Sequence, residues 1–196
     1  MVWIHPHTSD TALASVWDPI QKQKNLKRLV ILMTNHTGQG ARVSVPRDTV
    51  IPLKNGSPTI DQEGLTELMD LFPPLKKDAL SFEAEDLWGV FSFWNAQLEH
   101  TPIIPILVQD ISFERCVELG KALQRFHQKQ PTATGFLALA NLVEFVKPSQ
   151  AKTMNQKLLH DFHTLPPKLF FETWKKSPYY ICGLESLTSL QWVLKL

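Results

Sequence analysis

Residues 28–33 read Arg-Leu-Val-Ile-Leu-Met, and this segment decides the expected fold. Every residue after Arg28 is apolar, so a strand formed here would have to be covered on both faces. Two-sided apolar strands are typical of the centre of a parallel sheet that helices cover. Residues 2–4, Val-Trp-Ile, predict a second strand, and helix caps followed by helically spaced apolar residues lie between the two. The order strand, helix, strand predicts a right-handed βαβ unit.

The rest of the chain continues this pattern. Strands are expected at Ile103–Val108 and 135–140, and residues 41–54 read as irregular or edge strand because their prolines cannot donate to a sheet. Helices are predicted at 61–71, 84–98, 113–127 (capped by Ser112) and over most of the chain after Pro148, including the segment from 181 onward. We therefore predict one α/β domain over residues 1–196, with a mostly parallel central sheet flanked by helices. The strands at 2–4, 28–33 and Ile103–Val108 are expected to be neighbours.

Composition excludes several classes of protein. With 43% hydrophobic and 20% charged residues the chain is not disordered. A net charge of +1 argues against a dedicated nucleic-acid binder, and we expect the basic turn at 22–28 to be a solvated face without such a role. No glycine-rich phosphate loop is present, which argues against the common routes of nucleotide hydrolysis.

The cysteine usage and the amino-terminal segment indicate a compartment. Cys116 and Cys182 lie far apart and form no disulfide framework, which fits a reducing environment. The first residues do not resemble a signal peptide, and no apolar run approaches the roughly 20 residues of a membrane span. We expect a soluble cytoplasmic protein without a membrane partner.

Histidines follow the ends of two predicted strands. His5 or His7 follows the first strand and His36 follows the second, while Asn141 follows the strand at 135–140. Functional groups in open parallel sheets gather at the carboxyl ends of the strands. Because neutral imidazole is the commonest metal ligand, the two histidines are a candidate metal seat. The alternative is a pair of polar loop histidines.

Five motifs occur in the order found in the Memo family, the second component of the bacterial AmmeMemoRadiSam system. Residues 2–7 resemble the strand and PHA signature that opens the family, and residues 33–37 stand at its GPSHH turn. Residues 49–61 resemble its TPLG…VD segment, residues 104–108 its IPILVG strand, and residues 180–183 its ICG turn. The resemblance covers nearly the whole chain.

This resemblance implies the fold of class III extradiol ring-cleaving dioxygenases and a metal site. The family's metal ligands correspond to His7, His36 and Cys182 in this sequence. Two imidazoles and a thiolate suit iron or copper, with zinc possible, and three protein ligands leave a position open for chemistry. The alternative for Cys182 is a small buried core residue, which is the role expected for Cys116.

Two family motifs are altered. At the EHSxE helix, expected at residues 86–90, only the first acidic group remains. At the SSDFxH strand end, Asn141 replaces the aspartate and Glu144 the histidine. Asn141 cannot act as a general base. Glu144 either adds a carboxylate to the crevice or is a solvated glutamate at a helix start.

Two functions follow from the resemblance. The first is a metal-dependent oxidoreductase of dioxygenase type, in which Asn141 or Glu144 orients the bound species. The second is a catalytically silent interaction module that keeps the fold as a binding surface, as the human family member does with phosphotyrosine peptides. The associated partners of the family are a radical-SAM protein and an AMMECR-type protein.

Overall fold

A computed structural model describes residues 1–6, 20, 22–47, 58–84 and 101–195 of the chain. The elements in chain order are β1 (Val2–His5), β2 (Arg28–Thr34), β3 (Val43–Val45), α2 (Gln62–Leu71), β4 (Lys76–Lys77), α3 (Ala79–Ala84), β5 (Ile103–Val108), α5 (Phe113–Lys129), β6 (Thr134–Leu139), β7 (Leu142–Glu144), α6 (Pro148–Thr164), α7 (Pro167–Lys175), β8 (Tyr180–Cys182) and α8 (Leu184–Leu194). The helix predicted between the first two strands and the helix predicted at 84–98 fall largely or wholly outside the described residues.

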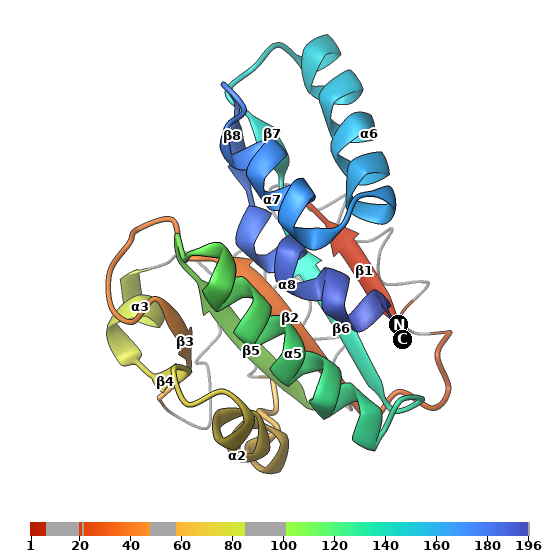
Figure 1. Cartoon of the computed structure of the whole chain (residues 1–196). Helices are drawn as coiled ribbons and strands as arrows, with labels where there is room; N and C mark the ends of the chain where they lie inside the picture. Colours follow the sequence, from red (N-terminus) through yellow and green to blue (C-terminus); the bar gives the residue numbers. More distant parts are fainter. Residues whose placement is uncertain (7–19, 21, 48–57, 85–100, 196) are drawn as a thin grey trace.

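The central sheet has six strands in the order β1-β6-β2-β5-β3-β4 (Figure 1). β1, β6, β2 and β5 run parallel, and β3 runs antiparallel to β5. The mostly parallel α/β architecture is therefore confirmed, as is the pairing of β2 with β5. One detail was wrong: β1 does not neighbour β2, because β6 lies between them. All six residues of β6 are buried, as a central strand requires, whereas three of the four in β1 are partly exposed.

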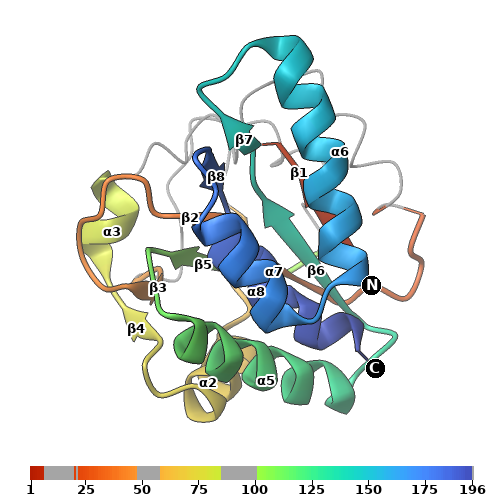
Figure 2. The same cartoon turned by 45° about the horizontal axis from the view of Figure 1, so that its top comes forward.

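Helices α5 and α8 lie side by side over one face of the sheet (Figures 1 and 2). Their buried side chains join those of β2, β5 and β6 in one hydrophobic core. α5 and α8 approach closely at Gly120, where an added Cβ would lie 2.6 Å from the carbonyl oxygen of Ser189. None of the helices in the described residues combines the length and the apolar character that crossing a bilayer requires.

The helix starts follow local chemistry. Ser112 caps α5 by accepting the backbone N–H of Arg115, as predicted, and Asp61 caps α2 by accepting that of Gly64. Pro148 and Pro167 each stand in the first turn of a helix, where a missing N–H costs nothing. These two prolines therefore begin α6 and α7 rather than interrupt a helix.

Arg28 differs from the rest of the basic turn before β2. Its Nε lies 2.9 Å from Asp61 Oδ2, and the two side chains are only 13% and 11% exposed. The guanidinium also lies 5.3 Å from the centre of the Phe126 ring. Arg28 is thus part of the structure that joins β2 to α2, rather than of a solvated face as expected.

A separate two-stranded ribbon stands beyond the carboxyl ends of the central strands. It pairs β7 antiparallel to β8, with Leu142 opposite Cys182 and Glu144 opposite Tyr180. The sequence predicted a helix from residue 181 onward, but the helix begins at Leu184, after the three-residue strand β8. The ribbon brings Cys182 back to the edge of the sheet where β2 and β6 end.

Candidate metal centre and adjoining pocket

His36 and Cys182 meet at the carboxyl end of β2. The Nε2 of His36 lies 3.5 Å from the Sγ of Cys182, and the Oγ1 of Thr34 lies at the same distance from that sulfur. Cys182 is fully buried, whereas His36 is exposed. Residues 146 positions apart are thus placed in contact by the fold.

The loop after β2 fixes the position of His36. The side-chain oxygen of Asn35 accepts hydrogen bonds from the hydroxyl of Thr37 and the N–H of Gly38, and its amide donates to the carbonyl of Gln39 at 2.7 Å. Gly38 takes a left-handed conformation, with φ of 67°. A buried asparagine that holds its own turn is a common way to rigidify a loop.

Gly183 fixes the position of Cys182. It has φ of 83° and precedes the first residue of α8. A Cβ at this position would lie 2.5 Å from the Cβ of Ala140, the residue after β6. Only glycine therefore allows the chain to turn from β8 into α8 so close to the sheet.

The other predicted site residues have different outcomes. His7 lies outside the described residues. His5 is 8% exposed at the end of β1, and its Nδ1 lies 2.8 Å from the carbonyl oxygen of Pro6. The amide of Asn141 donates to Glu144 Oε1 at 2.6 Å, so these two side chains are held together. Glu144 belongs to β7, which excludes the helix-start alternative. Cys116 fills the core on α5, and burial raises the pKa of its thiol.

The donor pair fits a metal ion. Metal–nitrogen and metal–sulfur bonds of about 2.1 and 2.3 Å at a tetrahedral angle place the two donor atoms about 3.6 Å apart. The distance between His36 Nε2 and Cys182 Sγ is 3.5 Å. Within the ranges of chain that the structure describes, no group of three His, Cys, Asp or Glu side chains is placed to hold a metal.

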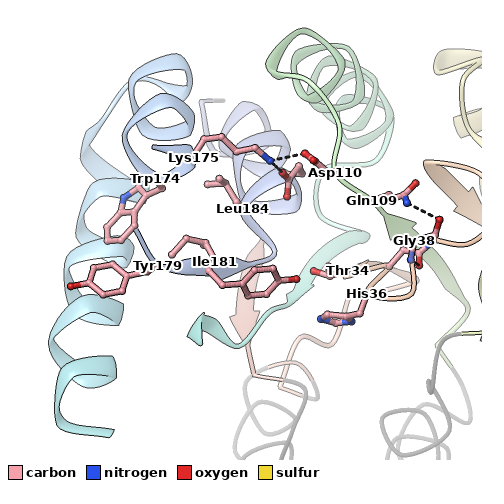
Figure 3. A pocket seen from close by; sticks show the side chains of 13 residues that line it. Thr34, His36, Gly38, Gln109, Asp110, Trp174, Lys175, Tyr179, Ile181 and Leu184 are labelled. Carbon is pink, nitrogen blue, oxygen red and sulfur yellow. Dashed lines mark hydrogen bonds and ion pairs between the residues drawn. The ribbon is translucent and has the colours of Figure 1, made fainter. Parts of the chain in front are cut away.

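A pocket of about 410 Å³ adjoins this pair (Figure 3). Its lining comes from the ends of β2 and β5, from α7, from β8 and from the start of α8. The residues are Thr34, Asn35, His36, Gly38, Gln109, Asp110, Trp174, Lys175, Tyr179, Tyr180, Ile181, Leu184 and Glu185. The pocket thus occupies the crevice at the carboxyl ends of the strands where ligands of α/β sheets bind.

Lys175 bridges two carboxylates at one wall of the pocket. Its Nζ lies 2.6 Å from Asp110 Oδ1 and 3.0 Å from Glu185 Oε1. Burial opposes the charge of Lys175, but the hydrogen bonds that it donates to Asp110 and Glu185, together with their negative charges, outweigh burial and raise the pKa of the ammonium group. Burial raises the pKa of Glu185, although Lys175 acts in the opposite direction.

Sequence reasoning did not select these three residues. Asp110 follows β5 at its carboxyl end, so the rule that selected His36 could have found it. Lys175 and Glu185 come from the facing ends of two helices and carry no such signal.

Comparisons with known proteins give a family and a fold. The sequence model of the family described as Memo-like protein matches residues 3–195. A crystal structure of the uncharacterized protein JW3007 from Escherichia coli K12 is similar, with a TM-score of 0.63 and 15% identity over 98% of this chain and 87% of that one. No curated protein matches the sequence.

Proposed function

This chain belongs to the Memo-like protein family, and from that membership we propose that it is a metal-binding protein whose ligands are His7, His36 and Cys182. Its fold is the mostly parallel, dioxygenase-like α/β fold of that family. The metal we propose is iron or copper, with zinc as the alternative, because imidazole and thiolate donors suit these ions.

The contact between His36 and Cys182 carries this proposal. Their donor atoms are 3.5 Å apart, as two ligands of one ion would be. The thiol of Cys182 is fully buried, and the ionised form that binds a metal would need a neighbouring positive charge to be stable there. A metal ion at this point would supply that charge.

The chemistry we propose is that of a non-haem oxidoreductase of dioxygenase type. A redox metal with three protein ligands supplies an open position for an oxygen-containing ligand. The pocket beside His36 would hold the substrate, and Asn141 with Glu144 would orient groups at the edge of the crevice. Thr34 would hold the sulfur of Cys182 in place through their 3.5 Å contact.

Metal analysis of protein purified without chelator tests the proposal. We expect close to one equivalent of iron, copper or zinc in the unaltered protein, and loss of most of it in His36→Ala, Cys182→Ser and His7→Ala. His160→Ala, an exposed histidine of α6, and Cys116→Ala, a core cysteine, are matched controls that should keep the metal. Equal metal content in Cys182→Ser and Cys116→Ala would overturn the assignment.

Cys182→Ser should also weaken soft ions more than hard ones, since thiolate is the soft ligand of the set. A comparison of His5→Ala with His7→Ala shows which of the two histidines is the third ligand. If His5→Ala loses the metal and His7→Ala keeps it, the third ligand is His5.

A second candidate is an interaction module, and an exposed aromatic pair favours it. Phe145 is 89% exposed and Tyr180 47%, and their rings lie 5.6 Å apart at the end of the β7–β8 ribbon. Exposed aromatic residues are enriched among those that anchor protein interfaces. The partners we propose are a radical-SAM protein and an AMMECR-type protein, by family association.

Binding of the two purified partners to this chain tests that candidate. Phe145→Ser should reduce binding at least about tenfold, as the loss of an interface anchor does. Leu169→Ser removes another exposed apolar side chain, on α7, and is the matched control. An equal loss of partner affinity in Phe145→Ser and Leu169→Ser, or no binding of either partner, would count against the interaction module.

We also propose a cytoplasmic location. Neither Cys116 nor Cys182 forms a disulfide in the structure, which is usual for proteins of a reducing compartment. Fractionation of cells that express the full chain should place it with cytoplasmic markers.

A further inference from the structure

The pocket beside His36 has one strongly polar wall and one apolar wall. Lys175, Asp110 and Glu185 form the polar wall. Leu184, beside Lys175, and Ile181, farther from it, give the apolar part of the lining (Figure 3). A pocket of this kind orients a ligand that is apolar at one end and polar at the other.

The polar wall carries an excess of negative charge. Two carboxylates share the ammonium group of Lys175, but the side chain of Asp110 is 75% exposed, so the unscreened negative charge is mainly that of Glu185. The side chain of Glu185 is only 13% exposed, so water screens its charge poorly. Arg42 lies nearby, but it is exposed and donates to the backbone carbonyl of Asp110 rather than to the carboxylate.

The same wall offers acceptors more than donors. Lys175 uses one oxygen of each carboxylate, and the amide nitrogen of Gln109 is turned away to the carbonyl of Gly38 at 2.8 Å. The amide oxygen of Gln109 and the remaining carboxylate oxygens are all acceptors. A ligand that matches this wall must bring N–H or O–H donors, and a positive charge would balance the excess.

We propose that the pocket binds a small ligand with a protonated amine, its ammonium group at Glu185 and Asp110 and its apolar body against Ile181 and Leu184. This inference rests on the proposed function, because it takes the pocket beside His36 and Cys182 as the substrate cavity. It adds the chemical class of the ligand, which the metal site alone does not determine.

Three probes that share a phenylethyl body and differ in the end group test the charge preference. They are 2-phenylethylamine, 2-phenylethanol and 3-phenylpropionate, titrated into the metal-free full-length protein and followed by NMR. We expect the amine to bind at least about tenfold more tightly than the alcohol or the carboxylate, because a charge-assisted hydrogen bond in a half-buried site is worth that much. Equal binding of the three probes, a preference for the carboxylate, or no binding overturns the inference.

Variants locate the preference at the polar wall. Glu185→Gln keeps the shape of the side chain and should reduce the advantage of the amine to less than about threefold. Glu172→Gln removes the same charge from a half-buried site on α7 that lies outside the pocket lining, and it should leave the advantage intact. Lys175→Met removes the competing cation, so the advantage of the amine should increase. The inference is overturned if the amine keeps the same advantage over the alcohol in both Glu185→Gln and Lys175→Met. If one of these variants folds poorly, the other decides.

Cys182→Ser separates this inference from the proposed function. The variant should lose the metal and keep the preference for the amine. If the unaltered protein binds no metal but prefers the amine, the metal proposal alone fails. If it binds the metal and shows no preference, the ligand class alone is wrong.

Discussion

Asp61 performs two tasks that can be separated by mutation. Its side chain accepts the N–H of Gly64 at 2.9 Å and so caps α2. Its Oδ2 also lies 2.9 Å from Arg28 Nε, at ion-pair distance, although the N–H is not aligned for a hydrogen bond. Asp61→Asn keeps the cap and removes the charge, because asparagine caps helices as well as aspartate does. Asp61→Ala removes both.

The expected losses follow from burial. Breaking a fully buried ion pair costs about 3–5 kcal/mol because the remaining charge is uncompensated. Arg28 keeps 13% exposure and its contact with Phe126, so we expect about 2 kcal/mol for Asp61→Asn. The lost cap adds about 1 kcal/mol, which gives about 3 kcal/mol for Asp61→Ala.

Urea denaturation measures both free energies of unfolding. For a chain of this size each kcal/mol corresponds to roughly 2–4 °C in Tm, so thermal unfolding provides a second measurement. The double variant Arg28→Met/Asp61→Asn should be more stable than Asp61→Asn alone, since it leaves no unpaired charge. If Asp61→Asn is as stable as the unaltered protein, the ion pair contributes nothing and the reasoning fails. Metal content should not change, because Asp61 lies at the opposite end of β2 from His36.

Three further predictions concern stability around the site and the core. Gly183→Ala should lower the free energy of unfolding by about 2 kcal/mol or more in urea titrations, because the new Cβ would clash with Ala140 in a left-handed turn; a neutral effect would show that the turn can relax. Burial, and then the N-terminal ammonium group, lower the pKa of His127 below the value of 6.5 in the unfolded chain. The unfolded chain therefore binds more protons than the folded chain below about pH 6.5, and the free energy of unfolding decreases as the pH falls. His127→Gln should reduce this pH dependence, measured by denaturation from about pH 5 to pH 8. Asp161 is 7% exposed and accepts the indole N–H of Trp174 at 3.2 Å. Asp161→Ala should lower the free energy of unfolding by about 2 kcal/mol, and Asp161→Asn, which keeps an acceptor, by less than half of that. Equal losses of stability in the two variants, measured by thermal unfolding, would argue against this hydrogen bond.

The sequence predicted the strands whose two faces are apolar. β2, β5 and β6 were found because complete burial leaves an unbroken apolar run. The order of the strands was not predictable in the same way, since more than a hundred residues separate β1 from its partner β6 in the sequence. β7 and β8 were missed because strands of three residues are too short for an alternating pattern.

The candidate site was likewise predictable only in part from the sequence. His36 and Cys182 were predicted together through a family resemblance and are found in contact, although no local pattern relates positions so far apart. The pairing of Asn141 with Glu144 depends on a left-handed turn at Leu142, with φ of 63°, which a bulky residue rarely adopts. The wall of Asp110, Lys175 and Glu185 is assembled from three elements, so only the tertiary structure shows it.

Strand β8 joins two regions that have been treated separately. Tyr180 is at one end of this three-residue strand and Cys182 is at the other, so the exposed aromatic pair and the buried sulfur share one short piece of backbone that is paired to β7. A partner that displaces Tyr180 would also move the sulfur relative to His36. By thermodynamic linkage, an ion held by that sulfur would in turn alter the affinity for the partner by the same factor. Binding of a partner at the aromatic pair and binding of an ion at Cys182 would then be coupled through the ribbon.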